Sequence, residues 1–428
     1  MKVLLIAEQA NPEWVSVPLV GWSLATAIAK QVNAHIVTQV RNRDAFLRQG
    51  LREGIDFTAI DSERVERPMY ALAGMLRGGN TLGWTTQTAL SSIVYPYFER
   101  LVWQRFGDAI RNREFDLVHR LTPLTPTAPS PLHRKCLKAG VPFIMGPLNG
   151  GLPWPEGYGD VRLKEKEWLS YVRSAYQFLP GVRATVSRAS VVIAGSRHTQ
   201  MELARLGRRQ DVLYMPENGI SEQFLSKVAA PYDGKVLKVC FVGRLVPYKG
   251  PDILLEAMLP FLKSGWVHVG VVGDGPMMPE LKAFVAHHDV AGSVTLHGWQ
   301  THESVKDILS QSHVLGFPSI REFGGGVVLE AMALGVVPVV VDYGGPGELV
   351  DAEIGIKVPI APRDAMVQSV RSAVERLLDG MHDVRELSAR ALSRVKQQHI
   401  WPQKAKQISS IYQEVLEIHM KKGAAAPL

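Results

Sequence analysis

Two glutamates, Glu322 and Glu330, stand on either side of three consecutive glycines, Gly324, Gly325 and Gly326. Because carboxylates accept hydrogen bonds, a pair at this spacing could hold the hydroxyls of one ligand. Glycines permit a close backbone approach, and their N–H groups at the start of a helix suit an anion or a sugar hydroxyl. The alternative is a simple turn between two solvated glutamates. Glu330, however, lies in the apolar stretch VVLEAMAL, where an unpaired carboxylate is costly.

Two cations, Arg244 and Lys249, lie in the segment GRLVPYKG. An apolar strand over Val239–Val242 precedes them, and a helix over Asp252–Met258 is expected to follow. At the end of a parallel strand, these two side chains could bind a diphosphate together. The Arg guanidinium can donate two parallel hydrogen bonds, and the Lys ammonium adds a compact positive charge. The alternative is a pair of exposed surface cations; the position in a strand-to-helix loop favours diphosphate binding.

A third glycine-rich turn, GDGP, follows the apolar run that begins near Gly270. It is not a dinucleotide fingerprint, because Met278 stands where that pattern needs its last glycine. The chain also contains no GK[ST] loop, which disfavours a phosphate-hydrolysing motor. Two cysteines, Cys136 and Cys240, exclude a disulfide framework and a four-thiolate zinc site.

Apolar, β-branched runs alternate with helical stretches along the whole chain. The expected strands are Val3–Ala7, His35–Val40, Leu117–His119, Phe143–Met145, Val191–Ala194, Val239–Val242, Val269–Val272, Val294–Leu296, Val314–Phe317 and Val337–Val341. Continuous apolar strands indicate parallel sheets that are covered on both faces. About five strands fill one doubly wound domain, so the pattern predicts an α/β fold of two Rossmann-like domains facing a central cleft.

The break between the domains is expected near 216–220 or in the turn-rich loop 229–234. The predicted domains are residues 1–215 and 216–402. A final helix over 403–428 follows Trp401-Pro402, since Pro disfavours helix in its predecessor.

The length of 428 residues exceeds one compact core, and 48 Lys and Arg against 41 Asp and Glu give a net charge of +7. This charge permits nucleotides, phosphorylated sugars, acidic lipids or nucleic acid as partners. No helix-turn-helix, zinc or RNP pattern supports nucleic acid. No apolar run approaches the roughly 20 residues that span a bilayer. Met1–Ala7 is interpreted as a buried strand and not as a signal peptide.

Taken in order, GRLVPYKG, GDGP, HGW and EFGGGVVLEAMALG resemble the family-4 retaining glycosyltransferases (glycosyl transferases group 1), which have the two-domain GT-B fold. The resemblance covers the second half of the chain well and the first half mainly by architecture. It implies a nucleotide-sugar site in the C-terminal domain. There Arg244 and Lys249 would hold the diphosphate and Glu330 the ribose hydroxyls.

The same resemblance implies that Glu322 and the backbone from Phe323 through the glycines contact the donor sugar, and that the base lies near Gly298 and Trp299. Prepositioned cations would stabilise the leaving diphosphate more than the ground state. The resemblance implies neither a cofactor nor a required metal. The chain agrees, because Asp342 is a lone carboxylate and not part of an acidic metal pair.

Candidates in the first half are fewer. Gly21 is expected to open a helix over Trp22–Val32, and the family places a glycine there against the leaving phosphates; the alternative is a plain helix start. His119, at the end of a strand, is a candidate catalytic residue, although Leu121 stands where family members commonly carry another histidine. The alternative for His119 is a satisfied core residue. The loop GPLNGG, 146–151, suits acceptor contact or a simple turn.

We therefore predict a retaining glycosyltransferase of polysaccharide biosynthesis that moves a hexosyl unit from a nucleoside-diphosphate sugar, with a UDP-sugar as the best expectation, to a glycan or lipid-linked acceptor. The expected location is the cytoplasm or the inner membrane face. The basic stretch Arg162–Arg188, with aromatic residues at helical spacing, could contact an anionic membrane, or it could be an amphipathic core helix. The other hypotheses are a GT-B-fold nucleotide-sugar epimerase and a non-catalytic nucleotide-sugar-binding subunit.

Overall fold

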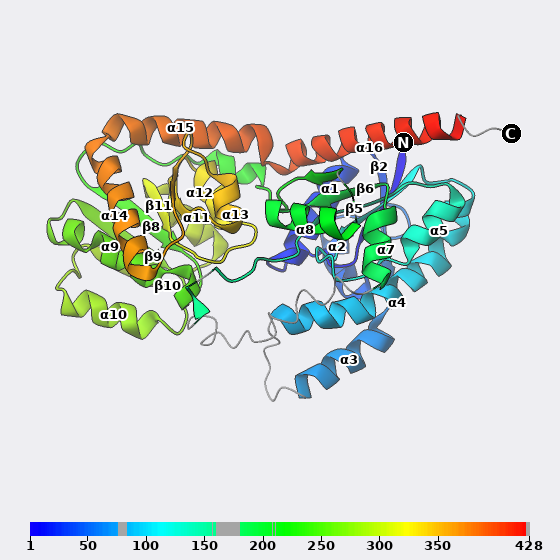
Figure 1. The fold of residues 1–428 in the computed structure, drawn as a ribbon, viewed down its shortest axis with the longest axis horizontal. Coiled ribbons are helices and arrows are strands. Elements are labelled where there is room, and N and C mark those ends of the chain that lie inside the picture. The colour runs from blue at the N-terminus through cyan, green and yellow to red at the C-terminus, as the bar shows by residue number, and fades with distance from the viewer. Residues whose placement is uncertain (76–83, 156, 160–179, 208, 210, 425–428) are drawn as a thin grey trace. The chain divides into compact units, whose positions relative to one another are not determined.

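The computed structural model describes residues 1–75, 84–155, 157–159, 180–207, 209 and 211–424. These residues form two compact units. Unit 1 gathers the described parts of Met1–Gly151, Glu167–Glu217 and Trp401–Leu428, and unit 2 gathers those of Leu152–Lys166 and Asn218–Ile400. In each unit a central sheet is covered by helices (Figure 1). The segment 152–159, which the sequence assigned to the first domain, belongs to unit 2.

The sheet of unit 1 has seven strands in the order β3-β2-β1-β4-β5-β6-β7, and every pairing is parallel. Its strands are β1 (Lys2–Ala7), β2 (Asn33–Gln39), β3 (Phe57–Ile60), β4 (Leu117–Thr122), β5 (Phe143–Leu148), β6 (Val191–Ala194) and β7 (Val212–Tyr214). The central strands β1, β4 and β5 are almost wholly buried, as expected for a sheet with helices on both faces.

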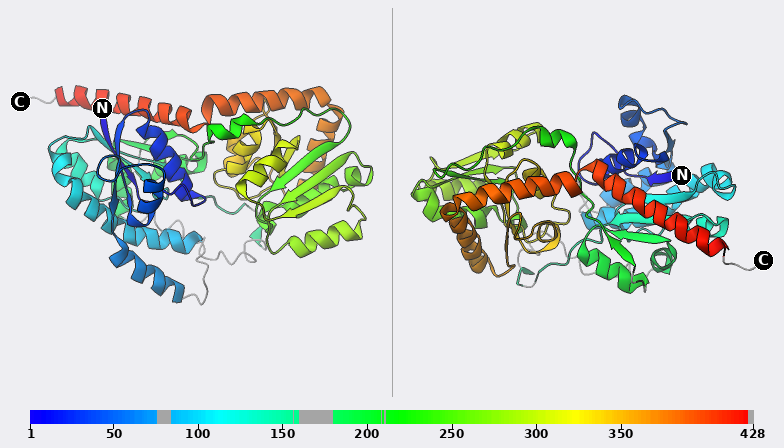
Figure 2. Two further views of the ribbon diagram at one scale, coloured as in Figure 1. Left: turned by 180° about the vertical axis from the view of Figure 1, so that it is seen from behind. Right: turned by 90° about the horizontal axis from the view of Figure 1, so that it is seen from above.

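The helices of unit 1 are α1 (Val17–Ala29), α2 (Arg43–Arg48), α3 (Glu63–Met75), α4 (Trp84–Arg111), α5 (Leu132–Ala139), α7 (Pro180–Arg188), α8 (Arg197–Gly207) and α16 (Trp401–Ala424). The last helix of the chain, α16, lies beside α1 (Figure 2). Its residues Ala405, Ile408 and Tyr412 are buried in one apolar cluster with residues of β1 and α1.

The sheet of unit 2 has six parallel strands in the order β10-β9-β8-β11-β12-β13. Its strands are β8 (Leu237–Val242), β9 (Val267–Val272), β10 (Val294–Gly298), β11 (Val314–Phe317), β12 (Val337–Val341) and β13 (Ile356–Val358). Its helices are α9 (Pro251–Lys263), α10 (Met278–His287), α11 (His302–Ser310), α12 (Gly326–Ala333), α13 (Gly344–Leu349), α14 (Arg363–Asp379) and α15 (Met381–Gln398).

All strands expected from the sequence are present, and both sheets are parallel, which confirms the α/β class. The sheets contain three further strands, β3, β7 and β13, and each lies at the edge of its sheet. An edge strand is short and half exposed, so it lacks the continuous apolar run that marks a central strand. The sequence criterion therefore found every central strand and one edge strand, β10, and missed the other three edge strands.

The first helix corrects one expectation. It begins at Val17 with Pro18 in its first turn, not at Trp22, so Gly21 lies inside the helix. A Cβ on Gly21 would stand 2.1 Å from the Gln9 carbonyl oxygen and 2.9 Å from Thr122 Cγ2. Glycine is required here because the helix passes directly against the backbone that follows β1.

No helix within the described ranges has both the length and the apolar character needed to cross a bilayer.

Candidate functional site

The predicted residues of the second half lie on loops at one edge of the unit 2 sheet, where the carboxyl ends of parallel strands meet. β8 and β11 are neighbours in this sheet, and their loops carry Lys249 and Glu322. The loops are bonded through their backbones, since the Ile320 N–H donates to the Tyr248 carbonyl oxygen at 2.9 Å. Gly250, at φ 70°, approaches so closely that a Cβ would stand 2.7 Å from the Pro318 carbonyl oxygen. The fold thus fixes these two loops side by side.

Lys249 and Glu322 form an ion pair, and the Lys249 ammonium donates to Glu322 Oε2. Their side chains retain 14% and 21% exposure, so the pair is sheltered but open to solvent on one side. The Lys249 ammonium also lies 5.3 Å from the centroid of the Phe317 ring. Arg244, from the same loop as Lys249, is exposed. A ligand with several negative charges could bind both cations by replacing the carboxylate partner of Lys249.

The loop of Glu322 is held from the side of α13. The Gly345 N–H donates to the Glu322 carbonyl oxygen at 3.0 Å. A Cβ on Gly344, at φ 63°, would stand 2.5 Å from that oxygen, and a Cβ on Gly345 would stand 2.3 Å from the Phe323 carbonyl oxygen. Two glycines after β12 therefore allow the backbone at Glu322 and Phe323 to be packed from behind.

The three glycines of the sequence pattern stand at the start of α12. Gly325 precedes the helix in the left-handed conformation, with φ 60°, and Gly326 is its first residue, while Gly324 lies in the loop before them. Glu330 follows about one turn later, as predicted. The helix N-terminus directs backbone N–H groups to the edge that carries Lys249 and Glu322, and such an end favours an anion.

Among the site residues at this edge of the sheet, Glu330 has the most strongly shifted pKa. Its side chain is 20% exposed, and burial raises its pKa to about 7. His302 Nε2 lies 3.8 Å from Glu330 Oε1, and burial lowers the pKa of His302, so its imidazole is largely neutral at pH 7. A carboxyl held in an apolar helix without a full counter-charge is a candidate ligand-binding group, because hydroxyl donors would stabilise its ionised form.

The GDGP turn has a packing role that the sequence did not reveal. A Cβ on Gly273 would stand 1.9 Å from the Gly243 carbonyl oxygen, and one on Gly275 would stand 2.5 Å from that of Leu245. The Leu245 N–H donates to the Asp274 carbonyl oxygen at 3.0 Å. These glycines thus seat the loop after β9 against the loop that bears Arg244 and Lys249.

Gly298 and Trp299 lie at the end of β10, at the outer edge of the sheet. Gly298 has φ 67°, and its carbonyl oxygen accepts from the Gly273 N–H at 2.8 Å. Trp299 is 72% exposed. Helix α11 begins three residues later with His302, so the same turn leads to the neighbour of Glu330.

His119 lies in the middle of β4, not at the end of a strand, and is fully buried. Its Nε2 lies 2.8 Å from the Gly146 carbonyl oxygen, so this nitrogen carries the proton; its Nδ1 accepts from the Tyr412 hydroxyl at 2.6 Å. Burial lowers the His119 pKa to about 4. Both ring nitrogens are used inside unit 1, which favours the core interpretation over the catalytic one.

Sequence reasoning missed several side chains that contact the site. Arg321 is 5% exposed, and its guanidinium carbon lies 4.7 Å from the Trp154 ring and 5.2 Å from the Phe323 ring. Trp154 also contacts the ring of Tyr248. Arg321 and Tyr248 could have been identified from the sequence, since they directly precede the predicted residues Glu322 and Lys249. Trp154 carried no such signal.

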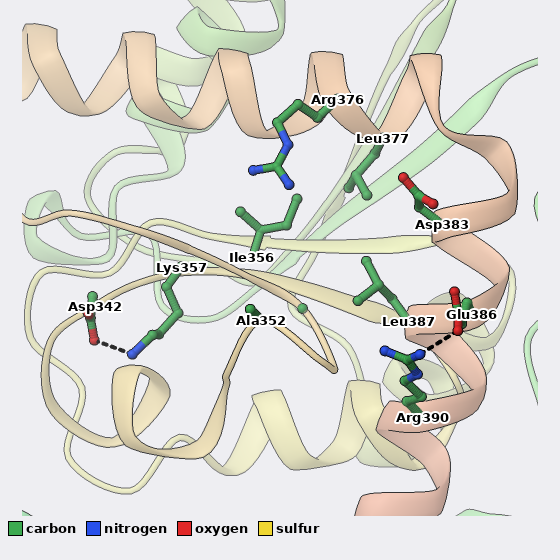
Figure 3. Close-up of a pocket in the computed structure, with 11 residues that line it drawn as sticks. Asp342, Ala352, Ile356, Lys357, Arg376, Leu377, Asp383, Glu386, Leu387 and Arg390 are labelled. Atoms are coloured by element: carbon green, nitrogen blue, oxygen red, sulfur yellow. Dashed lines mark hydrogen bonds and ion pairs between the residues drawn. The ribbon is translucent and has the colours of Figure 1, made fainter.

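Two other sequence expectations fall elsewhere. Residues 162–179 of the predicted basic stretch lie outside the described residues. Asp342 pairs with Lys357 at 2.9 Å on the wall of a cavity of about 520 Å³ between β13, α14 and α15 (Figure 3). The charged residues that line this cavity are three basic (Lys357, Arg376, Arg390) and three acidic (Asp342, Asp383, Glu386). None of the predicted site residues lines it.

The match to known families covers the part of the chain that bears this site. Residues 224–394 match the family described as Glycosyl transferases group 1. This segment of the chain is therefore similar to a group 1 glycosyltransferase domain. All the predicted residues of unit 2 lie within it, from Arg244 to Glu330.

The curated relatives of the group 1 domain are themselves named glycosyltransferases. The chain is 28% identical over 179 residues to alpha-D-kanosaminyltransferase of Streptomyces kanamyceticus, and 26% identical over 210 residues to the GPI3 subunit of phosphatidylinositol N-acetylglucosaminyltransferase of Saccharomyces cerevisiae. These alignments cover 41% and 47% of this chain. The chain spans about half the length of these relatives, 45% of each.

Solved structures extend the similarity to the whole fold. The Anabaena protein Alr3699/HepE in complex with UDP has a TM-score of 0.63 at 16% identity, covering 97% of this chain and all of that one. The same protein in complex with UDP-glucose has a TM-score of 0.58, also at 16% identity and with the same coverage. These likenesses support the fold alone, and they agree with the predicted GT-B class of two doubly wound parallel sheets.

Proposed function

We propose that this protein is a retaining glycosyltransferase that moves a hexosyl unit from a nucleoside-diphosphate sugar to a glycan or lipid-linked acceptor. The observation that carries the proposal is the Lys249–Glu322 pair beside the N-terminus of α12, within the group 1 domain. Cations and helix N–H groups suit a diphosphate, and the carboxylate suits sugar hydroxyls.

In the proposed reaction, the bond between the anomeric carbon and a diphosphate oxygen breaks. A new bond forms between the same carbon and an acceptor oxygen, whose proton is released. Negative charge grows on the departing diphosphate, so Lys249, Arg244 and the α12 N-terminus would stabilise the transition state more than the ground state. When Lys249 turns to the diphosphate, Glu322 becomes free to accept from the donor sugar.

Glu330 would bind the ribose hydroxyls and the turn at Gly298 and Trp299 would receive the base. Hydroxyl donors would compensate the burial of the Glu330 carboxylate, whose pKa is raised in the unliganded protein. We propose uridine as the base because the structurally similar Anabaena protein is described in complex with UDP and UDP-glucose. Product synthesis at a membrane surface, as part of polysaccharide biosynthesis, is the proposed setting for a lipid-linked acceptor.

A thermal-shift panel tests the donor. UDP, GDP, ADP and dTDP are compared with their hexose conjugates on the wild type, Glu330→Ala and the exposed control Glu303→Ala. A ligand at a hundred times its dissociation constant stabilises the folded state by about 2.7 kcal/mol. The proposal expects a uridine nucleotide to shift the wild type and the control but not Glu330→Ala. Shifts that are equal in all three proteins would remove Glu330 from the site.

Product analysis tests the reaction. With the donor found above, incubation with glycan and lipid-linked acceptors should give a glycoside with the anomeric configuration of the donor, read by NMR. Release of an altered free sugar without any acceptor would instead indicate an epimerase. Lys249→Met should slow donor consumption by roughly 10²–10³-fold, the usual effect of removing one group that stabilises transition-state charge. Wild-type rates in this variant would refute the assigned site.

A further inference from the structure

The described residues of the segment 152–159, which are all but 156, pack within unit 2, although β5 and the turn before them belong to unit 1. Leu152 and Tyr158 are 3% and 7% exposed. The Tyr158 hydroxyl donates to the Ala361 carbonyl oxygen at 2.5 Å, and Tyr158 belongs to the apolar core of unit 2. A segment far from unit 2 in the sequence is thus anchored in that unit at both ends.

Trp154, between these two anchors, contacts the residues that precede the two charged groups of the site. Its ring meets the Tyr248 ring edge-on, with centroids 6.1 Å apart and an interplanar angle of 86°. On another side the Arg321 guanidinium carbon lies 4.7 Å from the Trp154 ring centroid. Tyr248 is followed by Lys249, and Arg321 is followed by Glu322.

The segment also reaches the third loop of the site, the one that supports Glu322 from behind. The Pro153 carbonyl oxygen accepts from the Tyr343 hydroxyl at 2.9 Å. Leu152 fills the space beside Gly344, where a Cβ would stand 2.3 Å from Leu152 Cδ1. One short segment therefore contacts the loops after β8, β11 and β12, and the site residues Lys249 and Glu322 lie on two of them.

Arg321 explains why an aromatic residue is needed at position 154. Its guanidinium carbon lies 4.7 Å from the centroid of the Trp154 ring and 5.2 Å from that of the Phe323 ring. A cation over an aromatic face in a buried place is attracted by the ring quadrupole. Removing the Trp154 ring would take away one of these attractions and could shift Arg321, the residue that precedes Glu322 in the chain.

We propose that Trp154 is a positioning residue, which holds Tyr248 and Arg321, and through them Lys249 and Glu322, in the arrangement that the donor requires. This role rests on the function proposed above, because only that function gives Lys249 and Glu322 a donor to act on. Trp154 itself is not assigned to substrate contact.

The test compares Trp154→Leu, which fills much of the volume but removes the aromatic face, with Trp154→Phe, which keeps a ring. Trp266→Ala is the control, since Trp266 is 59% exposed in the same unit. The measurements are kcat and KM for release of UDP from UDP-glucose by the full-length protein, together with Tm. If the thermal-shift panel selects another donor, release of its nucleoside diphosphate is measured instead.

We expect Trp154→Leu to lower kcat by at least about tenfold while KM changes less than about threefold, because a misplacement of about 1 Å can cost up to 10²-fold. Trp154→Phe should keep most of the rate, and Trp266→Ala all of it. A wild-type kcat in Trp154→Leu would overturn the proposal. So would an equal loss in the Leu and Phe variants at unchanged Tm. If Trp154→Leu shows no cooperative melting, Trp154→Met takes its place as the variant without a ring, with the same expected result and the same result that overturns the proposal.

A double-mutant cycle separates positioning from general support of the fold. Lys249→Arg keeps a cation, so a measurable rate remains, and it is combined with Trp154→Leu. If Trp154 acts through Lys249, the two losses in kcat do not multiply, since residues that act as one unit are non-additive. Losses that multiply within about twofold would mean that Trp154 acts independently of the pair.

The failure of this inference is distinguishable from that of the proposed function. If Lys249→Met and Glu322→Gln consume donor at the wild-type rate, the proposed site itself is wrong. If these two variants are slow while Trp154→Leu is not, the proposed function stands and only the role of Trp154 is refuted.

Discussion

Ionisable side chains of the two units are held in different ways. In unit 1, Arg120 is fully buried in β4 and donates to three carbonyl oxygens, of Ala128, Thr125 and Pro123, at 2.8 to 3.1 Å. Glu99 is 1% exposed and accepts from the Leu132 N–H at 2.8 Å and from the Ser130 hydroxyl. In unit 2, Lys249 and Glu322 remain partly exposed and bond to each other.

This difference distinguishes charged side chains that hold the fold together from charged side chains that can bind a ligand. A side chain that is bonded to buried backbone cannot leave without opening the fold, because the unpaired carbonyl would carry the desolvation cost. The partly exposed ion pair between two loops of unit 2, in which neither side chain is hydrogen-bonded to buried backbone within the described residues, contributes less to stability and can be exchanged for a ligand. The comparison therefore predicts that substitutions of buried charged residues in unit 1 strongly lower stability. Substitutions of the charged site residues in unit 2 should lower activity and leave stability unchanged or increase it.

The largest expected effect on stability is that of Arg120→Met. It removes the donor for three carbonyl oxygens, and it removes the Arg120 cation that favours the ionised form of the buried Glu99 carboxyl, whose pKa is already raised by burial. Removing one partner of such a group typically costs about 3–5 kcal/mol. Urea unfolding measures the loss, with the exposed Arg134→Met as the control. If Arg120→Met lowered the free energy of unfolding by less than about 1 kcal/mol, the contrast between the charged residues of the two units would be wrong.

Glu330→Gln is expected to act in the opposite direction. The pKa of Glu330 is about 7 in the folded state and 4.5 in its ordinary environment, so between these pH values the folded state binds more protons than the unfolded state. Wild-type stability therefore falls as pH rises through this window, by up to about 3 kcal/mol. Glu330→Gln should be more stable than the wild type at pH 8 and nearly equal to it at pH 4.5.

The same substitution should weaken nucleotide binding, and this gives a second readout. Wild-type affinity should fall as pH drops below about 7, because a proton then competes with the ribose hydroxyls for the Glu330 carboxylate. Calorimetric titration with UDP from pH 5.5 to 8.5 measures this, with His302→Gln to test the neighbour at 3.8 Å. A flat affinity profile in the wild type would separate Glu330 from the nucleotide.

A smaller effect is expected from Tyr412→Phe. The substitution removes the hydroxyl that donates to His119 Nδ1, and losing one buried hydrogen bond costs about 1 kcal/mol. If His119 belongs to the core, donor consumption stays at the wild-type kcat while Tm falls slightly. A tenfold loss of kcat at unchanged Tm would return His119 to the catalytic residues.

The smallest effect is expected at the cavity of Figure 3. Lys357 and Asp342 form a pair at 2.9 Å, with side chains 32% and 51% exposed. Exposed pairs are usually worth about 0–1 kcal/mol, so Lys357→Gln should change neither Tm nor donor consumption measurably. A loss of activity there would place a functional group on a second edge of unit 2.

The sequence predicted the central strands and the loops that follow them, because continuous apolar runs and glycines leave a local signal. Glu330 was identified by the contrast between a carboxylate and its apolar helix, and the structure gives that contrast a raised pKa. The start of α1 was misplaced, since Pro18 at a helix start resembles a loop in the sequence.

Other features were not predictable because they depend on partners far away in the chain. His119 bonds to Tyr412, 293 residues later, and Trp154 contacts Tyr248 and Arg321 in the other half of the sequence. Nothing in the neighbourhood of either residue marks these contacts. The glycines of GDGP marked a turn in the sequence. The reason that glycine is required there is a tertiary contact, the close approach to the backbone at Gly243 and Leu245, which the sequence does not show.

The position of α16 has a consequence for the order of events during synthesis. Ala405, Ile408 and Tyr412 complete an apolar cluster with Val3, Leu5 and Leu24, so β1 waits for a helix that is synthesised after the whole of unit 2. Until that helix emerges, this apolar cluster is covered only in part, by helices such as α1, and its open part is exposed to aggregation. All the named strands and helices of unit 2 lie between Asn218 and Ile400, and the earlier segment that begins at Leu152 is already synthesised when they emerge. The unit synthesised first is therefore the one that finishes folding last.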